Sequence, residues 1–244
     1  MMPSTDRFPP EQLRRRVHGS ADLASFNAVG ARAAADLLAV FGKRLALDDA
    51  TILDFGCGCG RVLTHFRCSA GGKVYGTDID SEAIAWCREH LGPPSAFHVN
   101  GIRPPLPFTD GYFDLVYSVS VFTHLAERPQ LEWLAELRRI VKASGYVVLS
   151  THGAGLLRNM LGKRGIVGRK RAAMAPLHRL RLRWKGFSYA RGTGNGVEVP
   201  DFYGTALHAP HYIRRRWGRL LEIEDIVPRA LNGHQDLIVG RRRD

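Results

Sequence analysis

A short apolar segment that runs straight into a glycine-rich turn constrains this chain more than any other feature. The apolar residues are Thr-Ile-Leu-Asp-Phe at 51–55, and the turn is Gly-Cys-Gly-Cys-Gly at 56–60. The residues from Arg61 onward have the pattern of a starting helix. Glycines at such a turn let the backbone bend sharply and allow a ligand to approach the main chain without meeting a β-carbon. The pattern therefore predicts a ligand site at the end of a buried strand.

Apolar and helix-like segments continue to alternate after the turn. One helix is expected to begin at Asp80 or Ser81 and stop at Gly92, and another to span residues 131–141 and end at Ser144-Gly145. Such alternation is typical of a parallel sheet that helices cover on both faces. Four more buried strands are expected, at residues 73–78, 97–99, 113–118 and 146–150.

The two ends of the chain complete the expected architecture. Residues 11–45 have the pattern of two helices, and a helix from Pro210 to Trp217 precedes an expected antiparallel hairpin of strands at 220–227 and 236–239. The predicted fold class is α/β, a Rossmann-like doubly wound seven-stranded sheet with an antiparallel C-terminal hairpin. The predicted domains are an N-terminal helical cap at 1–45, a core at 46–152 and 209–244, and a basic insertion after the fifth strand at 153–208.

The net charge of +12 is concentrated in one segment. Residues 153–219 contain 15 basic residues and two acidic ones, whereas the rest of the chain is close to neutral. A field of one sign usually marks contact with nucleic acid, a phosphorylated substrate or a membrane surface, although a solvated surface has the same composition. The glycines of the insertion predict loops.

Other features exclude several classes of protein. No apolar run approaches the ~18–20 residues that a transmembrane helix requires, and the first ten residues lack the apolar stretch of a secretory signal. We therefore expect a cytoplasmic location. The spacing of Cys57, Cys59, Cys68 and Cys87 fits neither a disulfide framework nor a zinc site. We expect these thiols to pack under the turn, and we expect no bound metal.

An acidic residue, Asp78, ends the second expected strand, 18 residues after the last glycine of the turn. In nucleotide-binding sheets an acid at this place accepts hydrogen bonds from ribose hydroxyls. Dinucleotide-binding turns have the spacing GxGxxG, whereas this turn is GxGxG. The turn thus suits a ligand that carries a ribose but no pyrophosphate.

Residues 50–152 resemble the class I S-adenosylmethionine-dependent methyltransferases. Ile-Leu-Asp-Phe-Gly-Cys-Gly-Cys-Gly-Arg at 52–61 looks like motif I of that family, and Val-Tyr-Gly-Thr-Asp at 74–78 is similar to the second motif. The stretch at 105–118 resembles the approach to the fourth strand, and 137–149 the helix and fifth strand that follow. The resemblance implies a Rossmann-like fold, methyl transfer, and S-adenosylmethionine as the cofactor.

The resemblance also assigns the glycine turn to the cofactor. Gly56, Gly58 and Gly60 would pass under its amino-acid portion and its ribose. Asp54, just before the turn, would steady the turn or hold the ammonium group. These roles follow from the match to motif I.

Further residues at strand ends match the family's pattern. Asp78 would hold the ribose diol, and Ile79 would pack on the adenine. Asn100 stands where many members have an aspartate that contacts the adenine amino group, and its amide oxygen can accept the same bond. Ser118 and Val119, just past the fourth strand, would face the methionine end.

Three histidines are the candidate catalytic residues. Methyl transfer needs alignment and exclusion of water more than it needs a catalytic constellation, but a hydroxyl acceptor gains from a general base. His124 follows the fourth strand, His152 the fifth, and His208 precedes the late helix near the expected cleft mouth. Each could instead be a hydrogen-bonded structural histidine. Tyr203 and Tyr212 could be cleft walls.

The basic insertion bears on the substrate. Met174, Leu177, Leu180 and Trp184 have roughly helical spacing and are interleaved with basic residues, as in a helix that lies on an anionic membrane surface. The alternative is that these apolar residues face the protein core. The stretch after the fourth strand, Ser-Val-Ser-Val from 118, lacks the motif of nucleobase amino-methyltransferases.

The predicted function is methylation of a small-molecule, glycosyl or lipid-linked acceptor, at oxygen rather than nitrogen. Residues 153–208 would form a lid whose positive field attracts an anionic substrate and contacts the membrane peripherally. Two alternatives stay open: an RNA methyltransferase that uses the same basic surface, and a non-catalytic subunit that binds S-adenosylmethionine.

Overall fold

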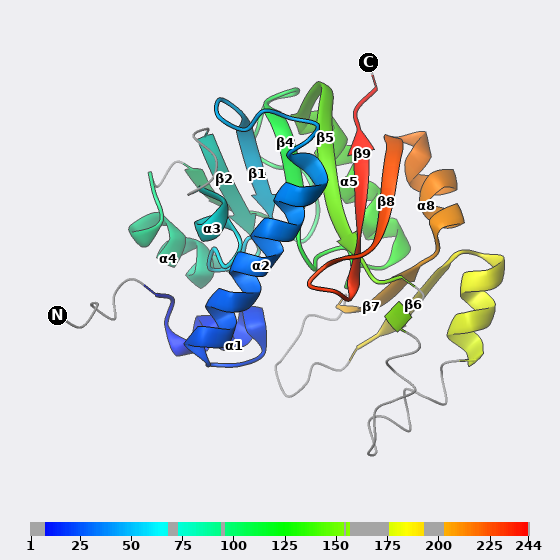
Figure 1. The fold of residues 1–244 in the computed structure, drawn as a ribbon, viewed down its shortest axis with the longest axis horizontal. Coiled ribbons are helices and arrows are strands. Elements are labelled where there is room, and N and C mark those ends of the chain that lie inside the picture. Colours follow the sequence, from blue (N-terminus) through cyan, green and yellow to red (C-terminus); the bar gives the residue numbers. More distant parts are fainter. Residues whose placement is uncertain are drawn as a thin grey trace.

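The chain folds around one seven-stranded mixed sheet with the strand order β3-β2-β1-β4-β5-β9-β8 (Figure 1). The computed structural model describes residues 8–67, 73–93, 96–153, 155–156, 176–192 and 203–243. Strands β1 to β5 are parallel, and β9 runs antiparallel between β5 and β8. The strands are β1 (Thr51–Phe55), β2 (Lys73–Asp78), β3 (Phe97–Val99), β4 (Phe113–Ser118), β5 (Val141–Thr151), β8 (Glu222–Leu231) and β9 (Gln235–Arg241). The predicted Rossmann-like sheet with its antiparallel C-terminal hairpin is confirmed.

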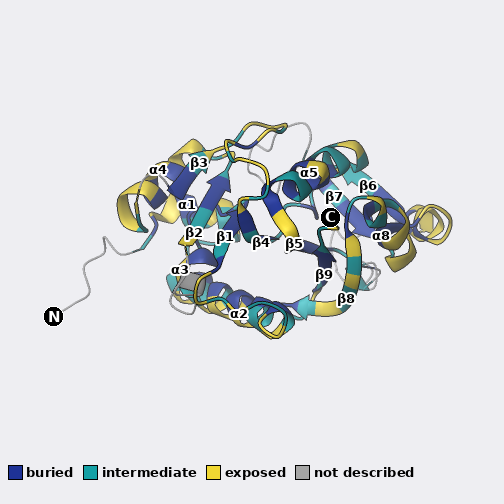
Figure 2. Cartoon of the chain, turned by 90° about the horizontal axis from the view of Figure 1, so that it is seen from above, coloured by how far each residue is buried: buried dark blue, intermediate teal, exposed yellow. Residues whose placement is uncertain are grey.

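Helices cover both faces of the sheet because alternate strand residues point to opposite sides. On one face α2 (Leu23–Phe41) packs on Ile52, Leu115 and Val148. On the other face, buried side chains of α5 (Glu127–Ile140) and α8 (Pro210–Arg216) belong to the same cluster as Leu53 and Val116 (Figure 2). The remaining helices of the core are α1 (Glu11–His18), α3 (Leu63–Arg67), α4 (Ser81–His90) and the 3₁₀ turn η3 (Trp217–Arg219).

Helix α2 is an exception to the expectation that no segment is apolar enough to span a membrane. By length and composition alone this helix is long and apolar enough to cross a membrane. In this fold its alanine- and leucine-rich face, which includes Ala33, Ala34 and Leu37, is buried against the sheet. The buried helix of a protein core has the same length and composition as a spanning helix.

The boundary between α5 and β5 differs from the prediction. The helix begins at Glu127 and ends at Ile140, and Val141 already pairs with Phe113 of β4. Ser144 donates its backbone N–H to the Arg242 carbonyl, and Arg242 donates its own to Gly145. These distant partners hold Val141–Gly145 in extended form, which the local sequence does not indicate.

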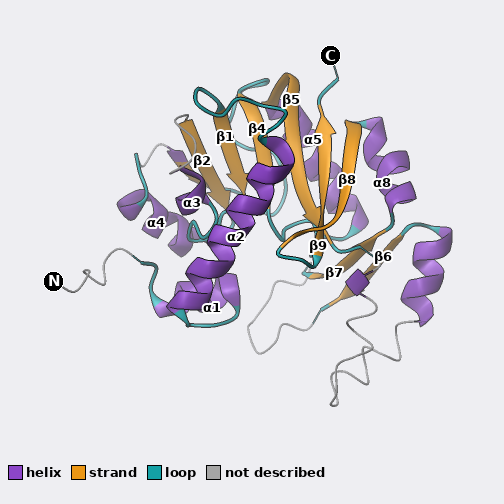
Figure 3. Ribbon diagram, viewed as in Figure 1, coloured by secondary structure: helices purple, strands orange, loops and turns teal. Residues whose placement is uncertain are grey.

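The described part of the basic insertion is more regular than the expected loops. Residues 176–184 form a helix, and β6 (Phe187–Arg191) pairs antiparallel with β7 (Gly204–His208) in a second, two-stranded sheet (Figure 3). Residues 157–175 and 193–202 lie outside the described residues. Backbone N–H groups of Gly204 and Ala206 donate to the carbonyls of His124 and Thr123. This pairing with the loop after β4 stabilises β7, and the domain boundaries stay a prediction.

Gly30 in α2 is the point where the helix meets the glycine turn. A β-carbon there would lie 2.3 Å from the carbonyl oxygen of Arg61 and 2.9 Å from its Cγ. Alanine is favoured over glycine in helices by roughly 1 kcal/mol, but here the methyl group would press on backbone. We expect Gly30→Ala to lower the free energy of unfolding by about 1–3 kcal/mol, measured by urea denaturation.

The matched control is Ala28→Gly at an exposed position of the same helix. This substitution should lower the free energy of unfolding by about 1 kcal/mol, through helix propensity alone. A Gly30→Ala protein that is more stable than the wild type would contradict the close approach of α2 to Arg61.

Candidate functional site

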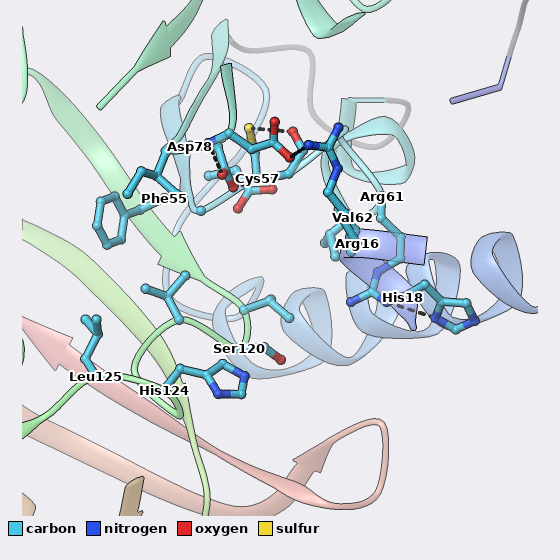
Figure 4. Close-up of a pocket in the computed structure, with 18 of the residues that line it drawn as sticks. Arg16, His18, Phe55, Cys57, Arg61, Val62, Asp78, Ser120, His124 and Leu125 are labelled. Carbon is cyan, nitrogen blue, oxygen red and sulfur yellow. Dashed lines mark hydrogen bonds and ion pairs between the residues drawn. The ribbon is translucent and has the colours of Figure 1, made fainter. Parts of the chain in front are cut away.

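A cavity of about 650 Å³ lies at the carboxyl ends of β1, β2 and β4 (Figure 4). In sheets of this kind ligands bind at the carboxyl ends of the strands, where neighbouring loops diverge. Helix α1 and the β6–β7 sheet both lie at this end of the main sheet (Figure 3). The wall residues come from α1, α2, the end of β1, the glycine turn and the residues after it, the loops after β2, β3 and β4, Trp133 of α5, Tyr203 and the β8–β9 hairpin.

The glycine turn forms the floor of the cavity and needs its glycines. Gly56, Gly58 and Gly60 have φ values of 81°, 53° and 78°, a region that side chains disfavour. The N–H groups of Gly56 and Cys57 donate to the Thr77 carbonyl at 2.7 and 2.9 Å, which fixes the turn to β2. Gly56 and Gly58 line the cavity, whereas Gly60 does not and shapes the turn from outside.

Three free thiols pack beneath the turn, as expected. Cys57, Cys59 and Cys87 are all buried and unpaired by disulfides. Burial raises the pKa of Cys59 to about 12, so the thiol stays protonated at neutral pH. Cys68 lies outside the described residues. In the described part of the chain, no group of three or more His, Cys, Asp or Glu side chains is placed to hold a metal.

Asp78 at the end of β2 joins the turn to the next helix. Its Oδ2 accepts from the Gly58 N–H at 2.7 Å, and its Oδ1 accepts from the Asp80 N–H at 2.9 Å. Burial raises the pKa of Asp78, and these two N–H donors oppose that shift. The carboxylate lines the cavity beside Ile79, whose side chain is 45% exposed. Both predicted residues thus line the cavity.

Asn100 follows β3 at the same wall of the cavity. Its Nδ2 donates to the Gly101 carbonyl at 2.9 Å, whereas its Oδ1 is buried without a hydrogen-bond partner in the described part of the chain. An unpaired buried acceptor costs free energy unless a ligand supplies a donor. The residue therefore presents an acceptor to whatever occupies this side of the cavity.

Asp54 is the penultimate residue of β1, close to the turn, and is 2% exposed. The Tyr117 hydroxyl donates to its Oδ2 at 3.0 Å. Burial raises the pKa of Asp54 to about 7, while the Tyr117 hydrogen bond opposes the shift. A buried carboxylate that lines a cavity and is poised near neutrality suits a cationic ligand group.

Sequence reasoning missed a contact between two basic residues, His18 of α1 and Arg61 directly after the turn. The Arg61 Nη1 lies 3.1 Å from the His18 Nδ1, and both residues line the cavity. Arg61 Nε is buried with no partner within the described residues, and burial lowers the Arg61 pKa. The position of Arg61 directly after the turn was the signal that could have found it.

Helix α1 is tied over the cavity by a second arginine. Arg16 pairs with Asp80 at 3.2 Å and also with Glu82, both at the start of α4. A β-carbon on Gly58 would lie 2.7 Å from Val17 Cγ2, so α1 packs directly on the turn. The N-terminal helices are therefore part of the site, which their sequence pattern alone does not indicate.

His124 lies on the opposite wall, in the loop after β4 (Figure 4). Its Nδ1 lies 2.8 Å from the Gly204 carbonyl, so Nδ1 carries the proton and Nε2 is the free acceptor in the neutral ring. Burial lowers the His124 pKa, which keeps the ring neutral. Tyr203 stacks on His124 with centroids 4.1 Å apart, and it is a cavity wall as the sequence suggested.

The other two predicted histidines do not line the cavity. His208 is 1% exposed, and its Nε2 lies 2.9 Å from Gln130 Oε1 in the core, so its expected place near the cleft mouth is wrong. Burial lowers the pKa of His208 to about 3 and that of His152 to about 4. Tyr212 is also a core residue, 1% exposed.

Ser118, the last residue of β4, and the residues that follow it divide between core and cavity. Ser118 is 1% exposed and donates its hydroxyl to the Phe55 carbonyl at 2.7 Å, so it holds β4 to β1 and does not line the cavity. Val119 lines it, as does Ser120, which has a φ of 63°. A non-glycine residue held in this strained region is often found at functional sites.

Known methyltransferases are similar to this chain in sequence. Residues 53–149 match the family described as a methyltransferase domain. The chain is 32% identical over 129 residues to malonyl-[acyl-carrier protein] O-methyltransferase of Erwinia pyrifoliae, covering 52% of this chain and 45% of that protein. It is 31% identical over 96 residues to fatty-acid O-methyltransferase of Mycolicibacterium smegmatis, covering 39% of this chain and 34% of that protein.

A similar fold is found in magnesium protoporphyrin IX methyltransferase of Synechocystis, solved with bound SAH. The TM-score is 0.62 at 16% identity, and the match covers 95% of this chain and 93% of that one. The chain spans less than half the length of the two curated relatives. Residues 53–149 therefore match a methyltransferase domain, and the chain shares the fold of this solved methyltransferase.

Proposed function

We propose that this protein transfers a methyl group from S-adenosylmethionine to a hydroxyl oxygen of a small-molecule, glycosyl or lipid-linked acceptor. The observation that carries the proposal is His124, whose free Nε2 is the candidate base in the wall of the cavity that holds the glycine turn and Asp78. The two curated relatives described above are named as O-methyltransferases, which supports oxygen as the accepting atom.

The cavity fits this cofactor at both of its ends. At the nucleoside end, the Asp78 carboxylate would accept from the ribose diol, Ile79 would cover the adenine, and the unpaired Asn100 Oδ1 would accept from the adenine amino group. At the amino-acid end, the Arg61 guanidinium would hold the carboxylate and Asp54 the ammonium group. S-adenosylmethionine supplies a methyl group on a sulfonium, which is already an activated leaving group.

Part of the cavity wall is apolar. Val121, Leu125 and Trp133 line it together with Tyr203. Such walls exclude water and hold an acceptor in line for displacement, which is the main requirement of this reaction.

His124 would take the acceptor's proton. The Gly204 carbonyl holds Nδ1–H, so Nε2 is the atom that receives the proton from an acceptor hydroxyl. Because burial keeps the ring neutral, this base is available at neutral pH without losing a proton first. Stacking on Tyr203 fixes the plane of the imidazole.

RNA methylation is a second candidate, favoured by the basic residues of the insertion. It would require binding to RNA at about 0.15 M salt with a steep salt dependence.

A cytoplasmic location is part of our proposal, and the three free buried thiols support it.

Asp78→Asn tests the cofactor site. The amide keeps the size of the side chain but removes the charge that faces the ribose, so we expect affinity for S-adenosylmethionine to fall by about 10- to 100-fold. Calorimetry measures the change, with Asp49→Asn, an exposed acid outside the cavity, as the control. Unchanged affinity in Asp78→Asn would overturn the assignment of this cavity.

Affinity for S-adenosylmethionine should also depend on pH through Asp54. Burial raises its pKa to about 7, so below that pH the carboxyl is increasingly neutral and loses its attraction for an ammonium group. We expect the affinity for S-adenosylmethionine to fall by up to about tenfold per pH unit as the pH is lowered from about 7 to about 5. In this range, binding of the ligand should release a proton from Asp54.

Two variants sharpen this measurement. Tyr117→Phe removes the hydrogen bond that opposes the rise in the Asp54 pKa, so the decline should begin at higher pH. Asp54→Asn should bind weakly and without this pH dependence. A wild-type affinity that stays constant between pH 7 and pH 5 would show that Asp54 does not hold the ammonium group.

His124→Asn separates catalysis from binding. The asparagine amide can still donate to the Gly204 carbonyl, but it has no group in the place of Nε2 that can accept a proton. We expect kcat to fall by about 10²- to 10⁴-fold, with the affinity for S-adenosylmethionine within about threefold of wild type. The assay follows release of S-adenosylhomocysteine with a panel of phenols, sugar alcohols and hydroxy fatty acids.

Different results of this assay identify different functions. Full activity in His124→Asn would remove the general base from the proposal. Tight cofactor binding without transfer to any acceptor of the panel would favour a non-catalytic subunit.

A further inference from the structure

The helix at residues 176–184 has an apolar stripe that faces away from the protein. Leu177, Leu180 and Trp184 are spaced by three and four residues, and their side chains are 44%, 55% and 72% exposed. The opposite side of the helix packs inward through His178 and Leu182, which are 2% and 6% exposed. The helix is coloured yellow near the edge of the molecule in Figure 1. Met174, expected on the same stripe, lies outside the described residues.

The inward packing shows that the register of this helix is held by specific contacts. His178 Nδ1 lies 2.8 Å from the Ser188 hydroxyl on β6, and Leu182 forms a small cluster with Leu207 on β7. A half turn about the helix axis would bury the stripe but break both contacts. Of the two orientations that the sequence allowed, the structure has the one that exposes the apolar side chains.

Basic residues border the stripe. Arg179, Arg181, Arg183 and Lys185 are exposed, and within the described residues none of them forms an ion pair with a carboxylate. The sequence from 176 to 192 contains no acidic residue. The face therefore combines unopposed positive charge with exposed aliphatic and indole side chains.

A basic hollow of about 440 Å³ continues the face at Lys185. Arg215, Arg216 and Arg219 of α8 and η3 line it, with Glu127 as its acidic residue. Arg216 and the Tyr212 hydroxyl both engage Glu127 Oε1, at 3.6 and 3.1 Å. Arg215 donates to the Lys185 carbonyl at 3.1 Å, which ties α8 to the end of the helix. A single carboxylate leaves the hollow strongly positive.

We define the docking surface as the apolar stripe, the basic residues that border it and this hollow. We propose that the docking surface binds a bilayer that contains anionic phospholipids. The cations would contact lipid phosphates, the hollow would accept one headgroup, and Trp184 with the two leucines would enter the boundary of the acyl chains. Exposed leucines gain nothing from the phosphates of RNA, so they favour a membrane over nucleic acid. The inference does not depend on methyl transfer or on cofactor binding.

Trp184 itself is the probe for the test. The other tryptophans, Trp86, Trp133 and Trp217, are buried, so contact quenching by lipid reports chiefly on Trp184. The full chain is mixed with vesicles of phosphatidylcholine alone or with phosphatidylglycerol, in each case with brominated acyl chains. We expect a blue shift and quenching with the anionic vesicles, weakened by added salt, and little change with the neutral ones.

Two variants separate charge from apolar contact while Trp184 is kept. Arg179→Glu with Arg183→Glu should weaken binding to anionic vesicles by at least about 30-fold, since each cation near such a surface contributes roughly fivefold. Leu177→Gln with Leu180→Gln should weaken it by roughly tenfold. The matched control, Lys43→Glu with Arg243→Glu, makes the same charge change at exposed sites elsewhere and should change binding by less than about threefold.

Several outcomes would overturn the proposal. Equal binding by the charge variant and its control would show that attraction is a property of net charge. Binding to anionic vesicles without quenching by brominated lipid would remove the apolar contact. Tight binding of a single-stranded RNA that the Arg179→Glu, Arg183→Glu variant loses, without vesicle binding by the wild type, would assign the surface to nucleic acid.

Discussion

The hydrogen bond from the Gly58 N–H to the Asp78 carboxylate is the interaction on which the rest of the site depends. It closes the glycine turn after β1 onto the end of β2, and the Thr77 carbonyl strengthens the same junction through two further N–H donors. Because neighbouring parallel strands end at one edge, this junction opens a single cavity next to β4. The charge on Asp78 is stabilised by the backbone and remains available to a ligand hydroxyl.

The walls around that junction come from parts of the chain that are far apart in sequence. Helix α1 packs Val17 on the turn and brings His18 to Arg61, while Arg16 ties the helix to α4. On the other side, β7 pairs with the loop after β4 and brings the Gly204 carbonyl to His124. The N-terminal helices therefore border the proposed cofactor, and the basic insertion borders the proposed acceptor.

Much of the fold and of the cofactor side could be predicted because those signals are local. The glycine turn, Asp54, Asp78 and Asn100 stand at strand ends whose periodicity is visible in the sequence, and the structure brings them to one cavity. The extended start of β5 could not be predicted, since its partners are in the C-terminal residues. Arg61, His18 and the burial of His208 also depend on contacts between distant segments.

The sequence by itself determined the α/β architecture, the resemblance of the core to a methyltransferase domain and the concentration of positive charge in one segment. The alternation of strands and helices, the turn chemistry and the composition suffice for these because they follow from local periodicity and from counting. Only the tertiary structure decided which histidine reaches the cavity and which side of helix 176–184 faces outward. Both depend on packing against residues tens of positions away, such as Gly204 for His124, and no local pattern encodes such a neighbour.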